Sequence, residues 1–204
     1  MSGRPPEAVL WDVGNVILRW DPKTLYSKIF PDAAERDWFL QNVCTFEWHA
    51  QTDLGCDMTG YVAAQAARFP EHAEAILAWR SRWLEMFSGA IPETEAAIKA
   101  LYARGVPQFG LSNMCGETVD ETLALSTAVA RLKDIVISGR EGVVKPDPRI
   151  FEIACERTGH EPGGLLFIDD SPANIAAAER LGFHVWLFGD PEGLRPALEA
   201  HGLL

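Results

Sequence analysis

The chain has 204 residues, enough for one well-buried α/β core with an accessory element but short for two independent domains. Hydrophobic residues make up 48% and charged residues 23%, which excludes a disordered or fibrous chain. The formal net charge of -11 opposes binding to nucleic acid or to anionic membranes, because the average field repels both. We therefore expect a self-folding protein in which a small anionic ligand needs a local positive site.

From the N-terminal segment and the cysteines we expect a cytoplasmic protein. The segment MSGRPPEAVLWDV has one Arg and a short apolar run, without a signal-peptide core or cleavage site. No later stretch approaches membrane-spanning length. Because the four cysteines form no C-x-x-C pair, zinc and thioredoxin-type motifs are disfavoured. We expect reduced thiols, although an oxidising compartment would permit a Cys44–Cys56 bridge.

Short apolar runs, rich in β-branched or aromatic residues, predict buried strands along the chain. Helical patterns fill the spaces between them, begun by prolines and ended by glycines. The predicted strands are Ala8–Val13, Gln108–Leu111, Asp134–Ile137, Leu165–Ile168 and His184–Phe188. The predicted core helices run from Pro92 to Gly105, from Pro148 to Thr158 and from Pro172 to Leu181.

Strands that alternate with helices predict an α/β fold, a Rossmann-like doubly wound parallel sheet. After the first strand, about 70 residues contain amphipathic helical patterns but no convincing strand, which is too long for a plain connection. We interpret residues 21–89 as an inserted helical cap, with Asp53–Gly55 and Thr59–Gly60 as turns. Residues 1–20 and 90–204 form the predicted catalytic core. The tryptophans of the cap, Trp38, Trp48, Trp79 and Trp83, are expected mainly in its hydrophobic interior.

Polar residues follow three of the predicted strands. Asp12 follows the first strand, Ser112 and Asn113 the second, and Asp169 and Asp170 the fourth. Because ligands of parallel α/β sheets bind beyond the carboxyl ends of the strands, these side chains are expected at one binding edge. An aspartate at a strand end is also a common turn former or helix cap, so Asp12 alone is a weak signal.

The adjacent carboxylates of Asp169 and Asp170 repel each other unless a cation or proton intervenes. Magnesium is a suitable partner, because it prefers oxygen ligands and often shares phosphate oxygens. Helix capping ahead of Pro172 is the alternative, and the two roles can coexist. Ser112 and Asn113 suit phosphoryl oxygens. Lys145, stiffened by neighbouring prolines, is either a charge partner for this site or a solvated loop residue.

Four segments, in order, resemble the signatures of the haloacid dehalogenase-like (HAD) hydrolase superfamily: V-L-W-D-V-G-N-V-I, F-G-L-S-N, G-V-V-K-P-D-P and L-F-I-D-D-S-P-A-N-I. The first is most similar to the branch that includes bacterial α-D-glucose-1-phosphate phosphatase. The resemblance implies that Asp12 attacks phosphorus to form an aspartyl-phosphate, which water then hydrolyses. It further implies that Ser112 binds a phosphoryl oxygen and that Lys145 neutralises charge. The implied Mg²⁺ ligands are Asp12, the main-chain carbonyl of Gly14, Asp169 and Asp170.

One position departs from the family pattern. Most phosphatases of the superfamily have a second Asp two residues after the nucleophile, as general acid and base, and here that position is Gly14. Such a loss typically costs about 10²–10⁴ in rate. A sugar 1-phosphate, with an anomeric leaving group, tolerates it better than a simple alkyl phosphate. We therefore expect a phosphatase acting on a small phosphorylated metabolite such as a hexose 1-phosphate.

A replacement proton carrier is expected in the cap, within Glu47–Asp53. His49 is the first candidate and a predicted substrate contact, although a structural histidine is the simpler interpretation. Asp53 is interpreted as a turn residue that is also able to contact a sugar hydroxyl. Asn15, Asn113 and Asn174 are expected to support the site by hydrogen bonding, Asn174 through the acidic loop.

Two other functions stay open. A 2-haloacid dehalogenase also uses an aspartate nucleophile without the second Asp, but it needs no metal, so the Asp169–Asp170 pair favours phosphate. Phosphonate cleavage needs a cap lysine, and Lys23 and Lys28 stand only at the beginning of the cap. A weakly active, phosphate-binding regulatory protein is the remaining alternative. The sequence leaves the oligomeric state open.

Overall fold

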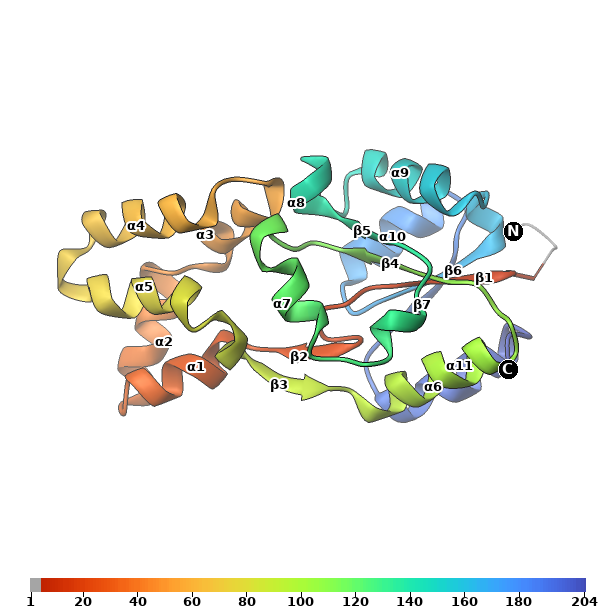
Figure 1. Cartoon of the computed structure of the whole chain (residues 1–204), viewed down its shortest axis with the longest axis horizontal. Coiled ribbons are helices and arrows are strands. Elements are labelled where there is room, and N and C mark those ends of the chain that lie inside the picture. The colour runs from red at the N-terminus through yellow and green to blue at the C-terminus, as the bar shows by residue number, and fades with distance from the viewer. Residues whose placement is uncertain (1–4) are drawn as a thin grey trace.

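A parallel sheet forms the centre of the larger part of the molecule (Figure 1). The computed structural model describes residues 5–204, so residues 1–4 of the predicted core lie outside the described residues. The strand order is β5-β4-β1-β6-β7, and every neighbouring pair is parallel. The strands are β1 (Ala8–Trp11), β4 (Gln108–Ser112), β5 (Ile135–Ile137), β6 (Leu165–Asp169) and β7 (His184–Leu187). The predicted α/β fold is confirmed, and each strand lies at its predicted apolar run.

Helices cover both faces of the sheet. Successive side chains of a strand point to opposite faces, so Val9 and Trp11 pack in one hydrophobic cluster and Ala8 and Leu10 in another. The first cluster includes side chains of α6 and α11, and the second includes side chains of α9 and α10. Burial on both faces explains why β1 is a continuous apolar run. The helices are α6 (Pro92–Ala103), α9 (Pro148–Thr158), α10 (Pro172–Arg180) and α11 (Leu194–Ala200).

The core helices begin and end as their prolines and glycines predict. In α9, the Asp147 side chain accepts a backbone N–H bond at the N-cap, and Gly159 ends the helix with a φ of 71°. Pro92 and Pro172 likewise begin α6 and α10. Two short helices, α7 (Val119–Leu123) and α8 (Ser138–Glu141), follow β4 and β5. Over residues 5–204, none of the helices combines the length and apolar character needed to cross a bilayer.

Residues 21–89, called the cap below, are mainly helical and have their own hydrophobic cluster (Figure 1). Trp48, Trp79 and Trp83 are buried there, as predicted, whereas Trp38 is 50% exposed. The prediction was therefore wrong for Trp38 alone. Where the cap begins and ends in the chain stays a prediction. Its helices are α1 (Pro22–Ile29), α2 (Ala33–Asn42), α3 (Phe46–Ala50), α4 (Met58–Arg68) and α5 (Ala73–Ser81).

Two local features differ from the predictions. The chain pairs β2 (Leu18–Trp20) with β3 (Phe87–Ala90) in an antiparallel ribbon where it passes between core and cap. These strands are too short and too mixed in polarity for a sequence pattern. The pair Thr59–Gly60 lies in the first turn of α4 rather than in a turn, because Asp57 caps that helix. By contrast, the 3₁₀ helix η1 (Thr52–Leu54) ends at Gly55 as a tight turn.

Close backbone packing holds the cap against the core beside β5. A Cβ atom at Gly139 would lie 2.7 Å from the Met114 carbonyl oxygen, and one at Gly55 would lie 2.6 Å from the Gly139 carbonyl oxygen. The Ser138 hydroxyl donates to the Asp53 carbonyl at 2.7 Å and accepts from the Met114 N–H at 3.0 Å. Only glycine permits this approach, which fixes η1 of the cap against the core.

We predict that Gly139→Ala lowers the free energy of unfolding by about 1–3 kcal/mol, because its Cβ meets backbone atoms that cannot turn aside. Gly189→Ala is the control, since no heavy atom lies within 4 Å of its added Cβ. We expect that variant to stay within about 0.5 kcal/mol of wild type in urea denaturation. Equal stability of the two variants would contradict the close packing at Gly139.

Candidate active site

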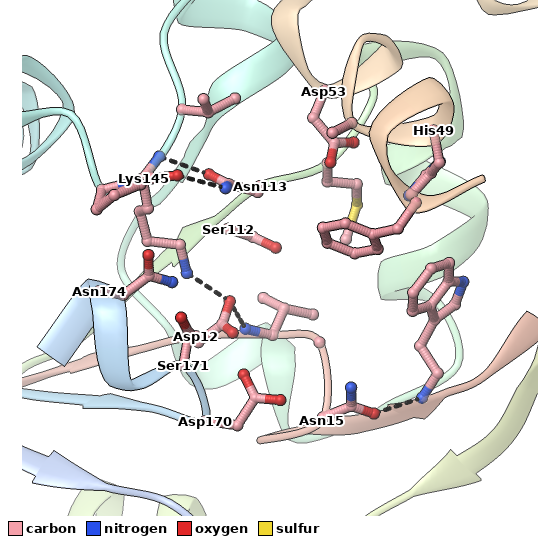
Figure 2. Close-up of a pocket in the computed structure, with 18 of the residues that line it drawn as sticks. Asp12, Asn15, His49, Asp53, Ser112, Asn113, Lys145, Asp170, Ser171 and Asn174 are labelled. Atoms are coloured by element: carbon pink, nitrogen blue, oxygen red, sulfur yellow. Dashed lines mark hydrogen bonds and ion pairs between the residues drawn. The ribbon is translucent and has the colours of Figure 1, made fainter. Parts of the chain in front are cut away.

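Asp12, Ser112, Asn113 and Asp170, four of the five polar residues predicted at the strand ends, line one cavity together with residues of the cap (Figure 2). The fifth, Asp169, is fully buried behind this lining. Its volume is about 450 Å³, a size suited to a small metabolite. The core contributes Asp12, Ser112, Lys145 and Asp170 to the lining, among others. The cavity thus lies beyond the carboxyl ends of the parallel strands, as the fold predicts.

A buried ion cluster centred on Lys145 forms the floor of the site. The Lys145 Nζ lies 2.8 Å from Asp12 Oδ1 and 2.7 Å from Asp169 Oδ2, and it donates to the Leu111 carbonyl at 2.9 Å. The side chain of Lys145 is only 2% exposed. The alternative of a solvated loop lysine is therefore wrong. Two carboxyl groups thus share one ammonium.

Burial and charge shift the pKa values in this cluster. Burial raises the pKa of Asp12, Lys145 opposes that shift, and the Asp169 carboxylate adds to it. Burial alone would lower the pKa of Lys145, but the two carboxylates outweigh it and raise that pKa. Lys145 is therefore a permanent cation. It favours the ionised form of Asp12, which a nucleophile requires.

Asp169 is held in place by its neighbours. Besides the Lys145 bond, its carboxylate accepts from the Ser171 N–H at 2.8 Å and from Asn174 Nδ2 at 3.0 and 3.1 Å. The prediction that Asn174 supports the acidic loop is confirmed. Both carboxylate oxygens of Asp169 already accept hydrogen bonds. Asp169 is therefore better placed to orient its neighbours than to be the main ligand of a cation.

Three carboxylates could hold a hard cation. Asp12, Asp169 and Asp170 each offer an oxygen, and these oxygens lie within 4.8 Å of one another. Asp170 lines the cavity, and its pKa is raised by burial and by the Asp169 charge, with Lys145 opposing. A divalent cation would relieve that repulsion, and an all-oxygen donor set suits magnesium. The residues present therefore fit a magnesium ion.

Two asparagines support the loops around the site. The Asn113 amide donates to the Lys145 carbonyl at 3.0 Å and accepts from the Lys145 N–H at 2.8 Å. This reciprocal pair favours a positioning role over the predicted substrate contact. Asn15, after Gly14, has a positive φ of 54°, and its Oδ1 accepts from the Trp20 N–H at 3.0 Å. Both confirm the expected structural hydrogen bonding.

His49 lines the cavity but lies among tryptophan rings. Its ring centroid is 5.1 Å from Trp20, 5.3 Å from Trp79 and 5.8 Å from Trp83. Burial lowers the pKa of His49 to about 4. The imidazole is therefore neutral at pH 7, which makes His49 a poor proton donor there. The hypothesis that His49 replaces the missing acid is disfavoured, while a substrate contact stays a prediction.

Sequence reasoning underestimated the part that Asp53 has in the site. It stands in the turn that ends at Gly55, as predicted, but its side chain is 8% exposed and lines the cavity. Its Oδ1 has no hydrogen-bond partner among the described residues. Burial raises the pKa of Asp53 to about 7, with Lys145 and the Cys115 N–H opposing.

Aromatic side chains form another part of the cavity wall. Trp20, Trp83 and Phe87 line it, and Phe46, 71% exposed, stands at its edge. Sequence reasoning did not place Trp20 and Phe87 in the site, because they belong to β2 and β3, whose pairing no local pattern signals. It expected Trp83 in the cap interior and did not single out Phe46 of α3. Ser112 ends β4 with only 1% exposure and lines the cavity as predicted.

The comparison with protein families is consistent with this geometry. A family model described as haloacid dehalogenase-like hydrolase matches residues 6–182. The chain therefore belongs to the haloacid dehalogenase-like hydrolase family, as its four signatures predict. It is accordingly a hydrolase.

Curated relatives include both phosphatases and dehalogenases. The chain is 31% identical to mouse acyl-CoA dehydrogenase family member 10 over 116 residues, which are 57% of this chain and 11% of that protein. It is 30% identical to phosphoserine phosphatase of Thermus thermophilus over 131 residues, 63% of this chain and 49% of that one. Haloacetate dehalogenase of Moraxella sp. is 27% identical over 97 residues, 47% and 43% of the two chains. The matches thus span at most about half of these relatives.

Solved structures match almost the whole chain. A predicted HAD-like hydrolase of Porphyromonas gingivalis has a TM-score of 0.75 and 20% identity, with 97% of this chain and 98% of that one covered. A HAD family enzyme of Bacteroides thetaiotaomicron, in complex with magnesium and inorganic phosphate, has a TM-score of 0.68 and 18% identity. That match covers 90% of this chain and 94% of the other. At these identities the likeness establishes the fold.

We predict that Asp53→Asn stabilises the protein more at pH 8 than at pH 5. The folded-state pKa of Asp53, about 7, lies above its ordinary value of 3.8. The folded protein therefore binds the Asp53 proton more tightly than the unfolded chain does, and the stability that this provides is lost as the pH rises from 3.8 to about 7. Asparagine does not ionise and escapes this loss. Thermal unfolding in EDTA measures the effect, with Asp57→Asn at the exposed N-cap of α4 as the control. An equal shift of Tm at both pH values would contradict the buried ionisation of Asp53.

Proposed function

We propose that the chain is a magnesium-dependent phosphatase that hydrolyses a small phosphate monoester through an aspartyl-phosphate on Asp12. The observation that carries this proposal is the carboxylate cluster of Asp12, Asp169 and Asp170 around the buried Lys145. A nucleophilic carboxylate, a fixed cation and oxygen ligands for a metal are what phosphoryl transfer requires. The magnesium and phosphate bound to the B. thetaiotaomicron enzyme support it.

The hydrogen bonds of Asp12 assign different roles to its two oxygens. Its Oδ1 lies 2.8 Å from Lys145 Nζ and accepts from the Val13 N–H at 2.7 Å (Figure 2). Oδ2 takes no part in either interaction and is the oxygen that attacks phosphorus. The ester P–O bond breaks as the new P–O bond to Asp12 forms. Water then attacks the aspartyl-phosphate, releasing phosphate and the free carboxylate.

The remaining residues bind and orient the phosphoryl group. The Ser112 hydroxyl donates to one of its oxygens, and Lys145 balances charge beside the nucleophile. Asp12, Asp170 and the main-chain carbonyl of Gly14 would hold magnesium, with Asp169 orienting the loop that carries Asp170. When bound, magnesium supplies positive charge to the phosphoryl oxygens.

The preferred substrate is a sugar phosphate such as a hexose 1-phosphate. A cavity of about 450 Å³ accommodates a single sugar ring with its phosphate. Aromatic walls from Trp20, Trp83 and Phe46 suit the apolar face of such a ring. An anomeric leaving group also needs less help from an acid, which suits a site with Gly14 in place of the second Asp.

The dehalogenase relatives and Gly14 favour 2-haloacid dehalogenation as the second candidate. In that reaction Asp12 would attack carbon, and the resulting ester needs no metal. Asp169 would still hold Lys145 in that reaction, but Asp170 would have no metal to bind. Aromatic walls around a cavity of about 450 Å³ also exceed the needs of a haloacetate. Phosphate release is therefore the better supported activity.

We predict phosphate release from a panel of hexose 1-phosphates, hexose 6-phosphates and p-nitrophenyl phosphate in magnesium, and none in EDTA. Asp12→Asn, which keeps the size of the side chain but lacks a nucleophilic carboxylate, should abolish release. Hexose 1-phosphates should rank above 6-phosphates. Colorimetric phosphate detection measures all three results.

Thermal unfolding of Asp12→Asn shows whether the variant is folded. Chloride release from a 2-chloroacid in EDTA, without phosphate release from the panel, would establish the dehalogenase instead. No release of either product by the wild type would favour the phosphate-binding regulatory protein.

A further inference from the structure

We propose that Asp53 of the cap is the general acid and base of the reaction and takes over the role of the aspartate that is absent at position 14, where this chain has Gly14. The inference rests on the proposed phosphatase function and adds the group that moves the proton. Figure 2 shows Asp53 entering the cavity from the cap, on the opposite side from Asp12. A leaving oxygen that departs from phosphorus, away from Asp12, faces the cap.

An unsatisfied oxygen marks Asp53 as a ligand-binding group. Its side chain is more than nine-tenths buried, yet Oδ1 has no hydrogen-bond partner among residues 5–204. Leaving a buried polar atom unpaired costs about 1–3 kcal/mol, so folded proteins keep few of them. Oδ1 itself is shielded from solvent, but its residue lines the cavity, so a substrate oxygen or an attacking water becomes its partner when the bound substrate draws the carboxyl group inward.

The backbone of Asp53 is fixed, as proton transfer requires. Its carbonyl accepts from the Ser138 hydroxyl of the core at 2.7 Å. The following Gly55 packs directly on the Gly139 backbone. The carboxylate is therefore carried by the cap but positioned by the core, close to the turn where the two meet.

Burial and the charges around Asp53 bring its pKa close to neutral pH. Burial raises its pKa to about 7, while Lys145 and the N–H of Cys115 lower it. The thiols of Cys56 and Cys115 also face Asp53, and His49 stands one turn earlier in the chain. Since burial lowers the pKa of His49 to about 4, that imidazole adds no positive charge at pH 7. A carboxyl group poised near pH 7 serves well as both acid and base.

The proton balance has two steps. As Asp12 Oδ2 bonds to phosphorus and the ester P–O bond breaks, protonated Asp53 gives its proton to the leaving oxygen, which departs as an alcohol. The Asp53 carboxylate then takes a proton from the water that attacks the aspartyl-phosphate. Hydrogen phosphate leaves, Asp12 recovers its carboxylate and Asp53 is protonated again.

The test compares two leaving groups in Asp53→Asn. With a hexose 1-phosphate, kcat should fall about 10²–10⁴-fold, because the leaving oxygen receives no proton. With p-nitrophenyl phosphate, whose leaving group departs unprotonated, the variant should release one p-nitrophenol per enzyme in a rapid burst. Slow turnover should follow, because water attack on the phosphoenzyme lacks its base.

The pH profile provides a second readout. For wild type, kcat/KM with the hexose 1-phosphate should decline as pH rises above about 7, where Asp53 loses its proton. Asp53→Asn should lack this decline. Asp57→Asn, the same substitution at the exposed N-cap of α4, should keep the wild-type rates and profile.

Distinct outcomes separate this inference from the proposed function. Equal losses with both substrates and no burst, or a rise in KM alone, would overturn the role of Asp53 while leaving the phosphatase intact. No phosphate release by the wild type would overturn the proposed function and this inference with it. Thermal unfolding of Asp53→Asn confirms that the variant is folded.

Discussion

The rest of the site depends on the buried ammonium of Lys145, held between the carboxylates of Asp12 and Asp169. Without this cation, two buried carboxylates would repel each other and take up a proton, and Asp12 would lose the ionised form that the proposed mechanism requires. The protein fixes the ammonium with the Leu111 carbonyl and fixes its backbone with the Asn113 amide. Strands β1, β4 and β6 thus meet at one charge, which explains why the site lies at this edge of the sheet.

Core and cap divide the chemistry between them. In the proposed mechanism the core supplies the nucleophile and the charges that bind phosphate, mostly at the ends of buried strands whose positions the sheet fixes. The cap supplies aromatic walls and, by our inference, the proton-transfer group Asp53. Gly14 stands where most phosphatases of the family have their acid. By our inference that role passes to Asp53 in η1 of the cap, which Ser138 and Gly139 of the core hold in place. In the proposed phosphatase, the proton carrier is in place only when the cap lies against the core.

The sequence predicts the sheet well because its strands are short apolar runs bounded by glycine and proline. These two residues end a strand or begin a helix through their own backbone geometry, whatever the rest of the fold. It also predicts Asp12, Ser112 and Asp170 at one edge, because parallel strands bring their ends together, whereas only the family resemblance assigns Lys145 of the loop before α9 to the site. Local patterns do not reveal the β2–β3 ribbon, which forms only through pairing across the cap. They also favour His49 over Asp53, since burial among tryptophans and an unpaired oxygen arise from tertiary packing.

The most direct measurement of the central claim is the mass of the protein during its first turnover. Wild type is mixed with a hexose 1-phosphate and magnesium, quenched in acid over a series of short times, and digested for mass spectrometry. Our account predicts a phosphoryl group on the peptide that contains Asp12, appearing before free phosphate and decaying as phosphate accumulates. Release of phosphate at the catalytic rate, with that peptide unmodified at every time, would contradict it.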